Sequence, residues 1–333
     1  MEKARFFKKL EDKKVHCTVC YRNCVIAPNS TGFCRVRKNV DGELYLITYG
    51  KVCACALDPI EKKPFYHFYP GSKAFSLSCV GCNFACSFCC NWEISHEWNE
   101  LGEELSPSRI VELAEKMGAD GLSYTYTEPS VWIEFALDIA KLAKKKYLYN
   151  TMVTNGYTQS EVIREIAKYI DAVVVDLKNS GSEEAYKKLS SISNAGKIFE
   201  SILEYKKRGV WLEITNLIVT KYGERKEDVQ KFCKWVVENL GDEIPVHFLK
   251  YFPSYKLTLP PTNTEFLLKC VEIAKKEGLK YVYLGNTPFA EYENTHCPEC
   301  GKLLIEREGV FLKHIHITEP YCPDCGKKIP VVL

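Results

Sequence analysis

Three cysteines with the spacing of a reactive metal site lie in the segment Cys82-Asn-Phe-Ala-Cys86-Ser-Phe-Cys89. This C-x3-C-x2-C spacing lets one short loop surround an iron–sulfur cube, with each thiolate bound to a different iron. Three thiolates leave one of the four irons without a protein ligand. An open position is what allows a metal site to bind and transform a second molecule, so the spacing predicts a reactive [4Fe–4S] cluster.

Two neighbouring cysteines leave an alternative open. Cys79 extends the motif to C-x2-C-x3-C-x2-C, a complete set of four thiolates that is typical of an electron carrier with no open iron. We favour Cys79 as a residue at a strand end that binds no metal. Cys90 follows Cys89 directly. Because adjacent residues rarely point at one iron, we expect Cys90 to bind no metal either.

A second group of cysteines forms two C-P-x-C-G segments near residue 300, which contain Cys297, Cys300, Cys322 and Cys325. Four thiolates close a tetrahedral site, and the glycine after each second cysteine lets the backbone turn toward the metal. We expect structural zinc; rubredoxin-type iron is an alternative, and a disulfide pair is disfavoured in a reducing compartment. Residues 291–333 have too little apolar mass to fold by burial alone, which supports a folding role for the metal.

A third group lies near the N-terminus and comprises Cys17, Cys20, Cys24 and Cys34. Zinc and an auxiliary [4Fe–4S] cluster both fit these four cysteines, and zinc is slightly preferred.

The composition excludes several classes of protein. The chain has 333 residues, and its 45 Lys and Arg nearly balance its 43 Asp and Glu, so no overall charge attracts nucleic acid or an anionic membrane. No apolar run approaches the roughly 18 residues of a membrane span, and residues 1–14 are charged without an apolar core. Its 17 cysteines then indicate metal or redox chemistry in a reducing compartment. We expect a cytoplasmic protein with neither a membrane nor a nucleic-acid partner.

The elements that must position these cysteines fall into three regions. We assign residues 1–72 to a Cys-rich N-terminal region, 73–290 to a core of alternating strands and helices, and 291–333 to a zinc-ribbon-like or rubredoxin-like C-terminal module. Strands are predicted at 74–79, 121–126, 147–153, 172–177, 210–219 and 246–251, with a possible further one at 281–284. Thr158 with Glu161, and Thr262 with Glu265, have the spacing of capping boxes that begin helices.

Alternating strands and helices predict an α/β fold with a parallel sheet, either doubly wound or closed toward a barrel. In both arrangements, functional residues gather at the carboxyl ends of the strands. Polar residues and cysteines do follow the predicted strands: residues 82–89 follow the first, 127–129 the second and 154–156 the third.

The cysteine motif at the end of the first predicted strand has an aromatic residue, Phe88, just before its last cysteine. In this the chain resembles the radical S-adenosylmethionine (SAM) superfamily. The chain is more closely similar to the pyruvate formate-lyase activating enzyme branch, and most narrowly to the radical SAM enzymes of the AmmeMemoRadiSam system. The resemblance is supported by residues 58–67, 81–86, 91–95, 124–129, 175–178, 213–216 and 247–256. It implies a partial (βα)6 TIM-type barrel.

The resemblance also implies roles for individual residues. Cys82, Cys86 and Cys89 would bind a [4Fe–4S] cluster whose open iron is chelated by SAM. The residues that would line SAM are Phe88, Thr127, Glu128, Asn155, Asp176, Lys178, Asn216 and His247. Acidic side chains suit the cationic sulfonium, and Lys178 or His247 suits the carboxylate of SAM. Tyr126 and Thr127 stand where the family has two glycines.

The function implied is that of a radical SAM oxidoreductase. Reductive cleavage of SAM would give a 5′-deoxyadenosyl radical that abstracts hydrogen from a protein, as in glycyl-radical activation, or from another substrate. The expected partners are a protein substrate, Memo-type or AMMECR-type proteins and an external one-electron reductant. Two alternatives remain at this stage: an iron–sulfur electron carrier with a four-cysteine cluster, and a zinc-ribbon interaction protein.

Overall fold

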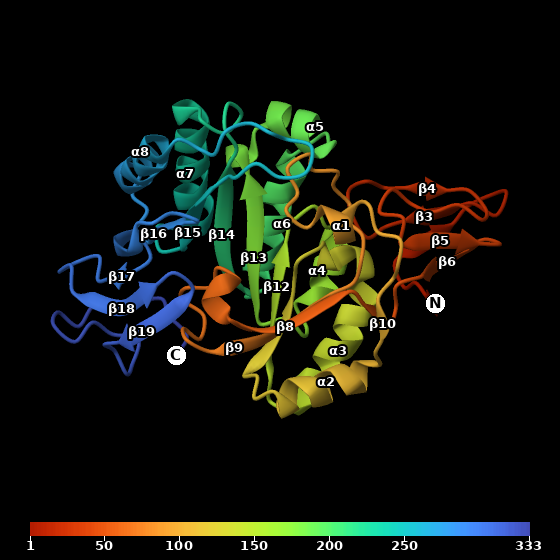
Figure 1. Ribbon diagram of the computed structural model, residues 1–333, viewed down its shortest axis with the longest axis horizontal. Helices are drawn as coiled ribbons and strands as arrows, with labels where there is room; N and C mark the ends of the chain where they lie inside the picture. Colours follow the sequence, from red (N-terminus) through yellow and green to blue (C-terminus); the bar gives the residue numbers. More distant parts are fainter.

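The computed structural model describes residues 1–333, and a sheet of eight strands lies at its centre (Figure 1). The strand order is β16-β15-β14-β13-β12-β11-β9-β8. The strands are β8 Ala54–Pro59, β9 Lys73–Ser78, β11 Gly121–Tyr124, β12 Tyr149–Thr154, β13 Ala172–Lys178, β14 Trp211–Ile218, β15 Val246–Lys250 and β16 Val282–Gly285. The consecutive valines 173–175 of β13 are fully buried, because strands of a parallel sheet are covered on both faces.

All neighbouring pairs from β9 to β16 are parallel, so the α/β class with a large parallel sheet is confirmed. The sheet has seven parallel strands, one more than the six of the expected (βα)6 barrel, because the possible strand near residue 281 forms as β16. Strand β8 pairs antiparallel with β9 and extends the sheet at its other edge. Residues 54–59 therefore contribute to the central sheet, although the predicted boundary at residue 72 places them in the N-terminal region.

Helices connect the parallel strands. They are α1 Trp92–Ser95, α2 Pro107–Lys116, α3 Ile133–Lys145, α4 Ser160–Ile166, α5 Glu183–Ser190, α6 Gly196–Lys207, α7 Lys226–Leu240 and α8 Thr264–Lys276. Cys233 and Cys270 are buried on the apolar faces of α7 and α8, where they pack in the main core. None of the helices combines the length and the apolar character that crossing a bilayer requires.

Both predicted capping boxes are wrong. The residue before α4 is Gln159, whose side chain caps nothing, and the N-cap of α8 is Asn263, whose side chain accepts a hydrogen bond from the Glu265 amide. The hydroxyl of Thr262 instead accepts from the Tyr251 amide and donates to the Ile218 carbonyl, which fixes the chain between β15 and α8.

The N-terminal region consists of short antiparallel strands. One sheet has the order β1-β6-β5 and another β2-β3-β4, while β7 pairs with β10. Their bounds are β1 Glu2–Lys3, β2 Phe7–Lys9, β3 Val15–Cys17, β4 Val25–Ile26, β5 Arg37–Val40, β6 Glu43–Leu46, β7 Lys51–Val52 and β10 Glu103–Glu104. The fully buried Arg37 of β5 forms an ion pair with Glu134 of α3, which attaches this region to the core.

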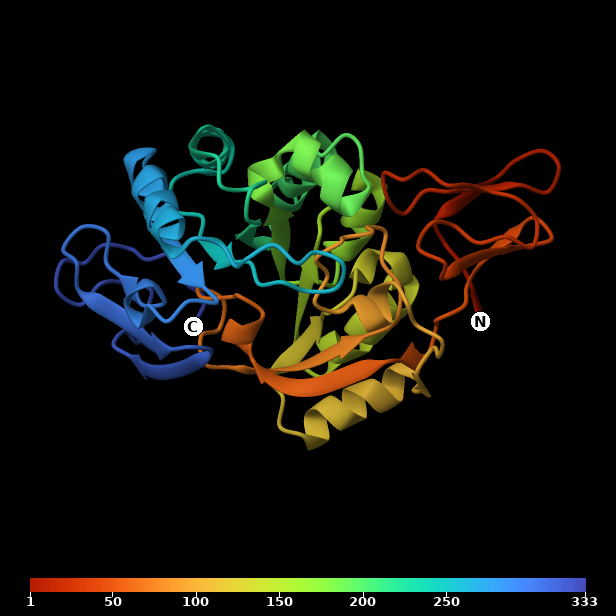
Figure 2. The same cartoon turned by 45° about the horizontal axis from the view of Figure 1, so that its top comes forward.

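The C-terminal module is a three-stranded sheet of β17 Thr295–His296, β18 Leu303–Glu308 and β19 Phe311–Ile315. A separate apolar cluster joins its Leu304 and Ile305 to Tyr283 of strand β16 and to Tyr281 just before that strand. Figures 1 and 2 show the N-terminal region and the C-terminal module on opposite sides of the central sheet.

Candidate functional site

A cavity of about 430 Å³ opens at the carboxyl ends of the parallel strands. Its wall includes residues that follow β9, β11 and β12, and the end of β13. This is the edge at which parallel α/β folds place their active sites. The volume lies within the range of small-molecule sites.

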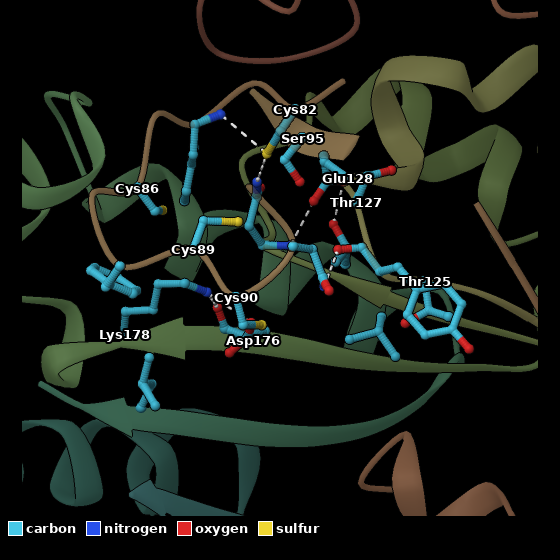
Figure 3. Close-up of a pocket in the computed structure, with 18 of the residues that line it drawn as sticks. Cys82, Cys86, Cys89, Cys90, Ser95, Thr125, Thr127, Glu128, Asp176 and Lys178 are labelled. Carbon is cyan, nitrogen blue, oxygen red and sulfur yellow. Dashed lines mark hydrogen bonds and ion pairs between the residues drawn. The ribbon is translucent and has the colours of Figure 1, made fainter. Parts of the chain in front are cut away.

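The three motif cysteines all line this cavity, together with Phe88. Figure 3 shows Cys86 and Cys89 on one side of the cavity and Thr127 on the other, with Cys82 near Glu128. The Phe84 amide donates to the Cys82 sulfur at 3.4 Å, and the Cys86 sulfur lies 3.1 Å from the Ser190 hydroxyl.

Burial raises the pKa of all three thiols, that of Cys89 to about 12. These groups are therefore neutral thiols unless a metal ion binds and displaces their protons. Three thiols on one loop that face one cavity fit the donor set of an iron–sulfur cluster with an open iron.

Glu128 also lines the cavity and is nearly completely buried. Its carboxylate accepts hydrogen bonds from the Ser130 amide at 3.0 Å, the Thr154 hydroxyl at 2.7 Å and the Asn155 amide at 2.8 Å. Burial raises the pKa of Glu128, and these donors oppose that rise. The side chain is therefore held rigidly by residues that follow two different strands.

Thr127 and Asn155 are each held in place beside Glu128. The Thr127 hydroxyl donates to the Cys79 carbonyl at 2.7 Å, and the Asn155 amide group donates to the Asn83 side chain at 2.6 Å. Asn155 thereby connects the loop after β12 to the cysteine loop.

Asp176 and Lys178 form the floor of the cavity at the end of β13 (Figure 3). The Lys178 ammonium donates to the Asp176 carboxylate at 2.8 Å, and the Thr215 hydroxyl donates to the same carboxylate at 3.0 Å. Burial disfavours the charge of Lys178, but the negative Asp176 and the Cys86 sulfur outweigh it and raise the pKa of the ammonium. A fixed cation thus lies close to the cysteine sulfurs.

Sequence reasoning missed one part of the cavity wall, which includes Lys62, Lys63 and Tyr126. Asp58 connects them: it pairs with Lys62 at 2.7 Å and Lys63 at 2.8 Å and accepts from the Tyr126 hydroxyl at 2.7 Å. Burial opposes ionisation of Asp58, but these three partners lower the pKa of its carboxyl group. The signal was available, because residues 58–67 were among the segments that supported the resemblance.

Two predicted residues lie outside the cavity. The Asn216 side chain accepts from the Ser180 amide at 2.9 Å and donates to the Ser180 hydroxyl at 3.0 Å, so it holds the turn that follows β13. His247 of β15 is hydrogen-bonded to Glu213 of the neighbouring strand β14 at 2.9 Å. Asn216 is the sixth of the eight residues of β14, and His247 is the second of the five residues of β15. Neither lines the cavity, and their expected contact with SAM stays a prediction.

The additional cysteines of the motif differ in position. Cys79 is fully buried and does not line the cavity, whereas Cys90 is exposed and does. The position of Cys79 speaks against a four-thiolate cluster at this site.

The four C-terminal cysteines form a compact group in which all four sulfur atoms lie within 4.8 Å of one another. Cys297 and Cys325 are 3.5 Å apart between their sulfurs, and Cys300 and Cys322 are 3.6 Å apart. Four thiolates around a single ion at about 2.3 Å have this kind of spacing. The group can therefore hold one metal ion.

The four N-terminal cysteines line a small pocket of their own. They do not form a group with single-ion spacing; among the His, Cys, Asp and Glu side chains of residues 1–333, only the C-terminal four do.

Comparison with known proteins identifies relatives of the whole chain and of its core. The sequence profile of the radical SAM superfamily matches residues 77–236. Uncharacterized protein MJ0808 of Methanocaldococcus jannaschii is 44% identical over 338 residues, which cover 100% of both chains. The pyruvate formate-lyase-activating enzyme of Clostridium pasteurianum is 26% identical over 208 residues, which cover 60% of this chain and 84% of that enzyme.

Among solved structures, SuiB of Streptococcus suis bound to S-adenosylmethionine has a similar fold. The TM-score is 0.52 at 16% identity, and the match covers 68% of this chain and 55% of SuiB. At this identity the likeness concerns the fold.

Proposed function

Because this chain belongs to the radical SAM superfamily, we propose that Cys82, Cys86 and Cys89 hold a [4Fe–4S] cluster and that the adjoining cavity binds SAM. The observation that carries this proposal is the convergence of the three motif thiols, the carboxylates of Glu128 and Asp176 and the ammonium of Lys178 on a single cavity at the carboxyl edge of the sheet. When bound, the reduced cluster would supply the electron that splits SAM into methionine and a radical able to abstract hydrogen.

The residues of the cavity have complementary tasks in this proposal. Glu128 and Asp176 provide negative charge for the cationic sulfonium and amino groups, and Lys178 provides positive charge for the carboxylate. Phe88 offers an apolar surface for the adenine, and Asn155 supplies polar contacts toward the ribose. Because Glu128 and Asp176 already accept hydrogen bonds from fixed donors, they need little rearrangement on binding.

We further propose that the substrate is a protein, and that a Memo-type or AMMECR-type protein is a candidate partner. The name of the Clostridium pasteurianum relative supports a protein substrate, since it describes an enzyme that activates another enzyme. An external one-electron reductant is required, because none of the side chains at the cavity can donate an electron of low potential. The C-terminal cysteines would hold structural zinc.

The proposal is tested by comparing two cysteine variants after anaerobic reconstitution with iron and sulfide. Cys86→Ala should lose the cluster and the dithionite-dependent release of 5′-deoxyadenosine from SAM, because Cys86 lines the cavity. Cys79→Ala should keep both, because Cys79 does not. Loss of the cluster in Cys79→Ala would instead support the four-thiolate electron carrier.

A further inference from the structure

One charged group on the cavity wall has no task in the proposed binding of SAM. In that proposal Glu128, Asp176 and Lys178 complement the charges of SAM. Lys62 lines the same cavity from another part of the fold. It is the last residue of the 3-10 helix Ile60–Lys62, which follows the antiparallel edge strand β8. A molecule that enters the cavity beside SAM therefore meets the ammonium of Lys62 as a separate positive charge.

The two neighbours of Lys62 in the chain fix this segment. Glu61 and Lys63 are each 3% exposed. The Glu61 carboxylate accepts a hydrogen bond from the Gly71 amide at 2.8 Å, and the Lys63 ammonium pairs with Asp58 at 2.8 Å. The side chain of Lys62, in contrast, is 49% exposed. The backbone is thus held on both sides of the one residue whose ammonium stays accessible.

The charges of this wall do not balance. Asp58 is the partner of both lysines, because its Oδ1 atom contacts Lys62 at 2.7 Å and its Oδ2 atom contacts Lys63 at 2.8 Å. The Lys63 ammonium also lies over the Tyr126 ring, 4.2 Å from the ring centroid. The Lys62 ammonium uses one of its three donors on Asp58. One negative charge therefore faces two positive charges, and only Lys62 has donors to spare.

Contacts of Tyr126 connect this wall to the side of the cavity away from Cys86. Thr125 lies across the cavity from Cys86 in Figure 3, and the residue after it, Tyr126, donates its hydroxyl to Asp58 at 2.7 Å. In the proposed function SAM is bound at the cysteine loop. The wall that carries Asp58 and Lys62 is therefore suited to contact a second molecule.

We propose that Lys62, oriented by Asp58, binds a carboxylate of the protein substrate and so selects a substrate segment that carries an acidic residue. The inference rests on the proposed function, because it names what the same cavity recognises. A carboxylate beside Lys62 would balance the excess positive charge of the wall. Because Asp58 already holds the ammonium, little side-chain freedom is lost on binding. A phosphate group has the same charge complementarity, and the experiment separates the two sources.

Peptide affinity tests the inference in the unmodified protein. Calorimetric titrations of reconstituted, SAM-bound protein compare an acetylated and amidated peptide, Gly-Glu-Gly-Gly-Glu-Gly, with its counterpart in which Gln replaces Glu. SAM is present because its cationic groups offset Glu128 and Asp176. The acidic peptide should bind about fivefold more tightly than the neutral one. This preference should shrink at about 1 M salt, since the ammonium is half-exposed. Equal affinities, or binding of neither peptide, would overturn the inference.

Substitutions locate the charge that produces this preference. Lys62→Gln should abolish the preference for the acidic peptide, and Lys62→Arg should keep it. The control Lys116→Gln alters an exposed lysine at the end of α2 and should behave as the unmodified protein. If Lys62 only stabilises its own segment, Lys62→Gln will melt at a lower temperature and keep the preference, which contradicts the inference. Should Lys62→Gln fail to fold, the comparison of peptides in the unmodified protein still decides.

Two further measurements separate this inference from its alternatives. GTP tests a phosphate as the source of negative charge: tighter binding of GTP than of the acidic peptide, lost in Lys62→Gln, would assign the wall to a phosphate and overturn the carboxylate. Release of 5′-deoxyadenosine is measured in the same unmodified protein. Cleavage of SAM with equal peptide affinities would overturn only this inference. A preference for the acidic peptide in protein that cannot cleave SAM would refute the proposed function and leave the carboxylate site in place.

Discussion

At the scale of single residues, a group of buried, hydrogen-bonded polar side chains lies at the amino ends of the strands, away from the cavity. His67 is fully buried there, with its Nδ1 atom 2.6 Å from the Pro330 carbonyl and its Nε2 atom 2.6 Å from the Tyr283 hydroxyl. A neutral ring satisfies both contacts when Nδ1 donates and Nε2 accepts. Glu213 accepts from the Tyr66 and His67 amides and is bonded to His247.

His67 should make the protein sensitive to mild acid. Burial lowers the pKa of His67 to about 4, against about 6.5 in the unfolded chain. The unfolded chain therefore binds the extra proton between these values, and the free energy of unfolding should fall by about 3 kcal/mol as pH drops from 6.5 to 4. Urea titrations across this range measure it. His67→Gln should flatten the pH dependence and the exposed control His314→Gln should not; an unchanged slope in His67→Gln would contradict the assignment.

Asp176 should matter for SAM affinity and leave the cluster unaffected. Its carboxylate lines the cavity and contacts no cysteine sulfur that would bind iron. Asp176→Ala should weaken SAM binding by calorimetry about tenfold, equivalent to about 1.4 kcal/mol, with iron content unchanged. The surface control Asp12→Ala should bind SAM normally. Equal affinity in the two variants would remove Asp176 from the binding site.

The sequence predicted the cavity residues correctly where they follow the carboxyl end of a predicted strand. Cys82, Thr127, Asn155 and Lys178 follow or end predicted strands, and all line the cavity. His247 does not, because it is the second residue of β15 and so lies at the amino end of that strand. The predicted strand began at residue 246, so its bounds already placed His247 at the amino end of the strand, whereas the family resemblance placed His247 beside SAM.

At the scale of elements, strands were predictable and their supporting contacts were not. Runs of β-branched residues identify β13 and β14 locally. The two predicted capping boxes are wrong because each helix has its N-cap one residue after the threonine, at Gln159 and Asn263. In addition, the Thr262 hydroxyl donates to the Ile218 carbonyl and so does not cap the helix. Strand β8 carries no β-branched residue, and its place in the sheet depends on pairing with β9.

The contact between β5 and α3 should be essential for stability. Both Arg37 and Glu134 are almost fully buried, so removing one partner leaves the other charge without compensation. Glu134→Ala should lower the free energy of unfolding by about 3–5 kcal/mol in urea titrations. The control Glu112→Ala breaks the exposed pair with Arg109 and should cost below about 1 kcal/mol. Similar losses in both variants would show that burial of the pair is unimportant.

At the scale of the whole molecule, the C-terminal module closes the amino-end side of the sheet. The Arg307 side chain reaches the Tyr66 carbonyl, the Thr295 hydroxyl is 2.9 Å from the Tyr283 hydroxyl, and Pro330 contacts His67. The local spacing of the cysteines predicted that the four would form one group in this module, and their sulfurs do lie together. The location of the module could not be predicted, because these contacts join residues that are distant in the chain.

Loss of the C-terminal metal should therefore destabilise the protein without removing the central cluster. Cys297→Ser/Cys322→Ser should lose one metal ion per chain and several kcal/mol of unfolding free energy. Because the module lies on the far side of the sheet, iron content and SAM cleavage per folded molecule should stay near wild type. Metal analysis together with calorimetric melting checks both. Loss of cleavage in molecules that remain folded would mean that the module takes part in the reaction.

The N-terminal cysteines depend on residues that are made much later in the chain. Cys20 forms a β-bridge with Thr158, the Gln159 amide donates to the Val19 carbonyl, and Arg37 needs Glu134. On the ribosome, the first four thiols therefore emerge long before the segments that enclose them. The pocket that these thiols line is therefore complete only after translation has passed residue 159, and slow elongation over that stretch would prolong the exposure of the thiols to solvent.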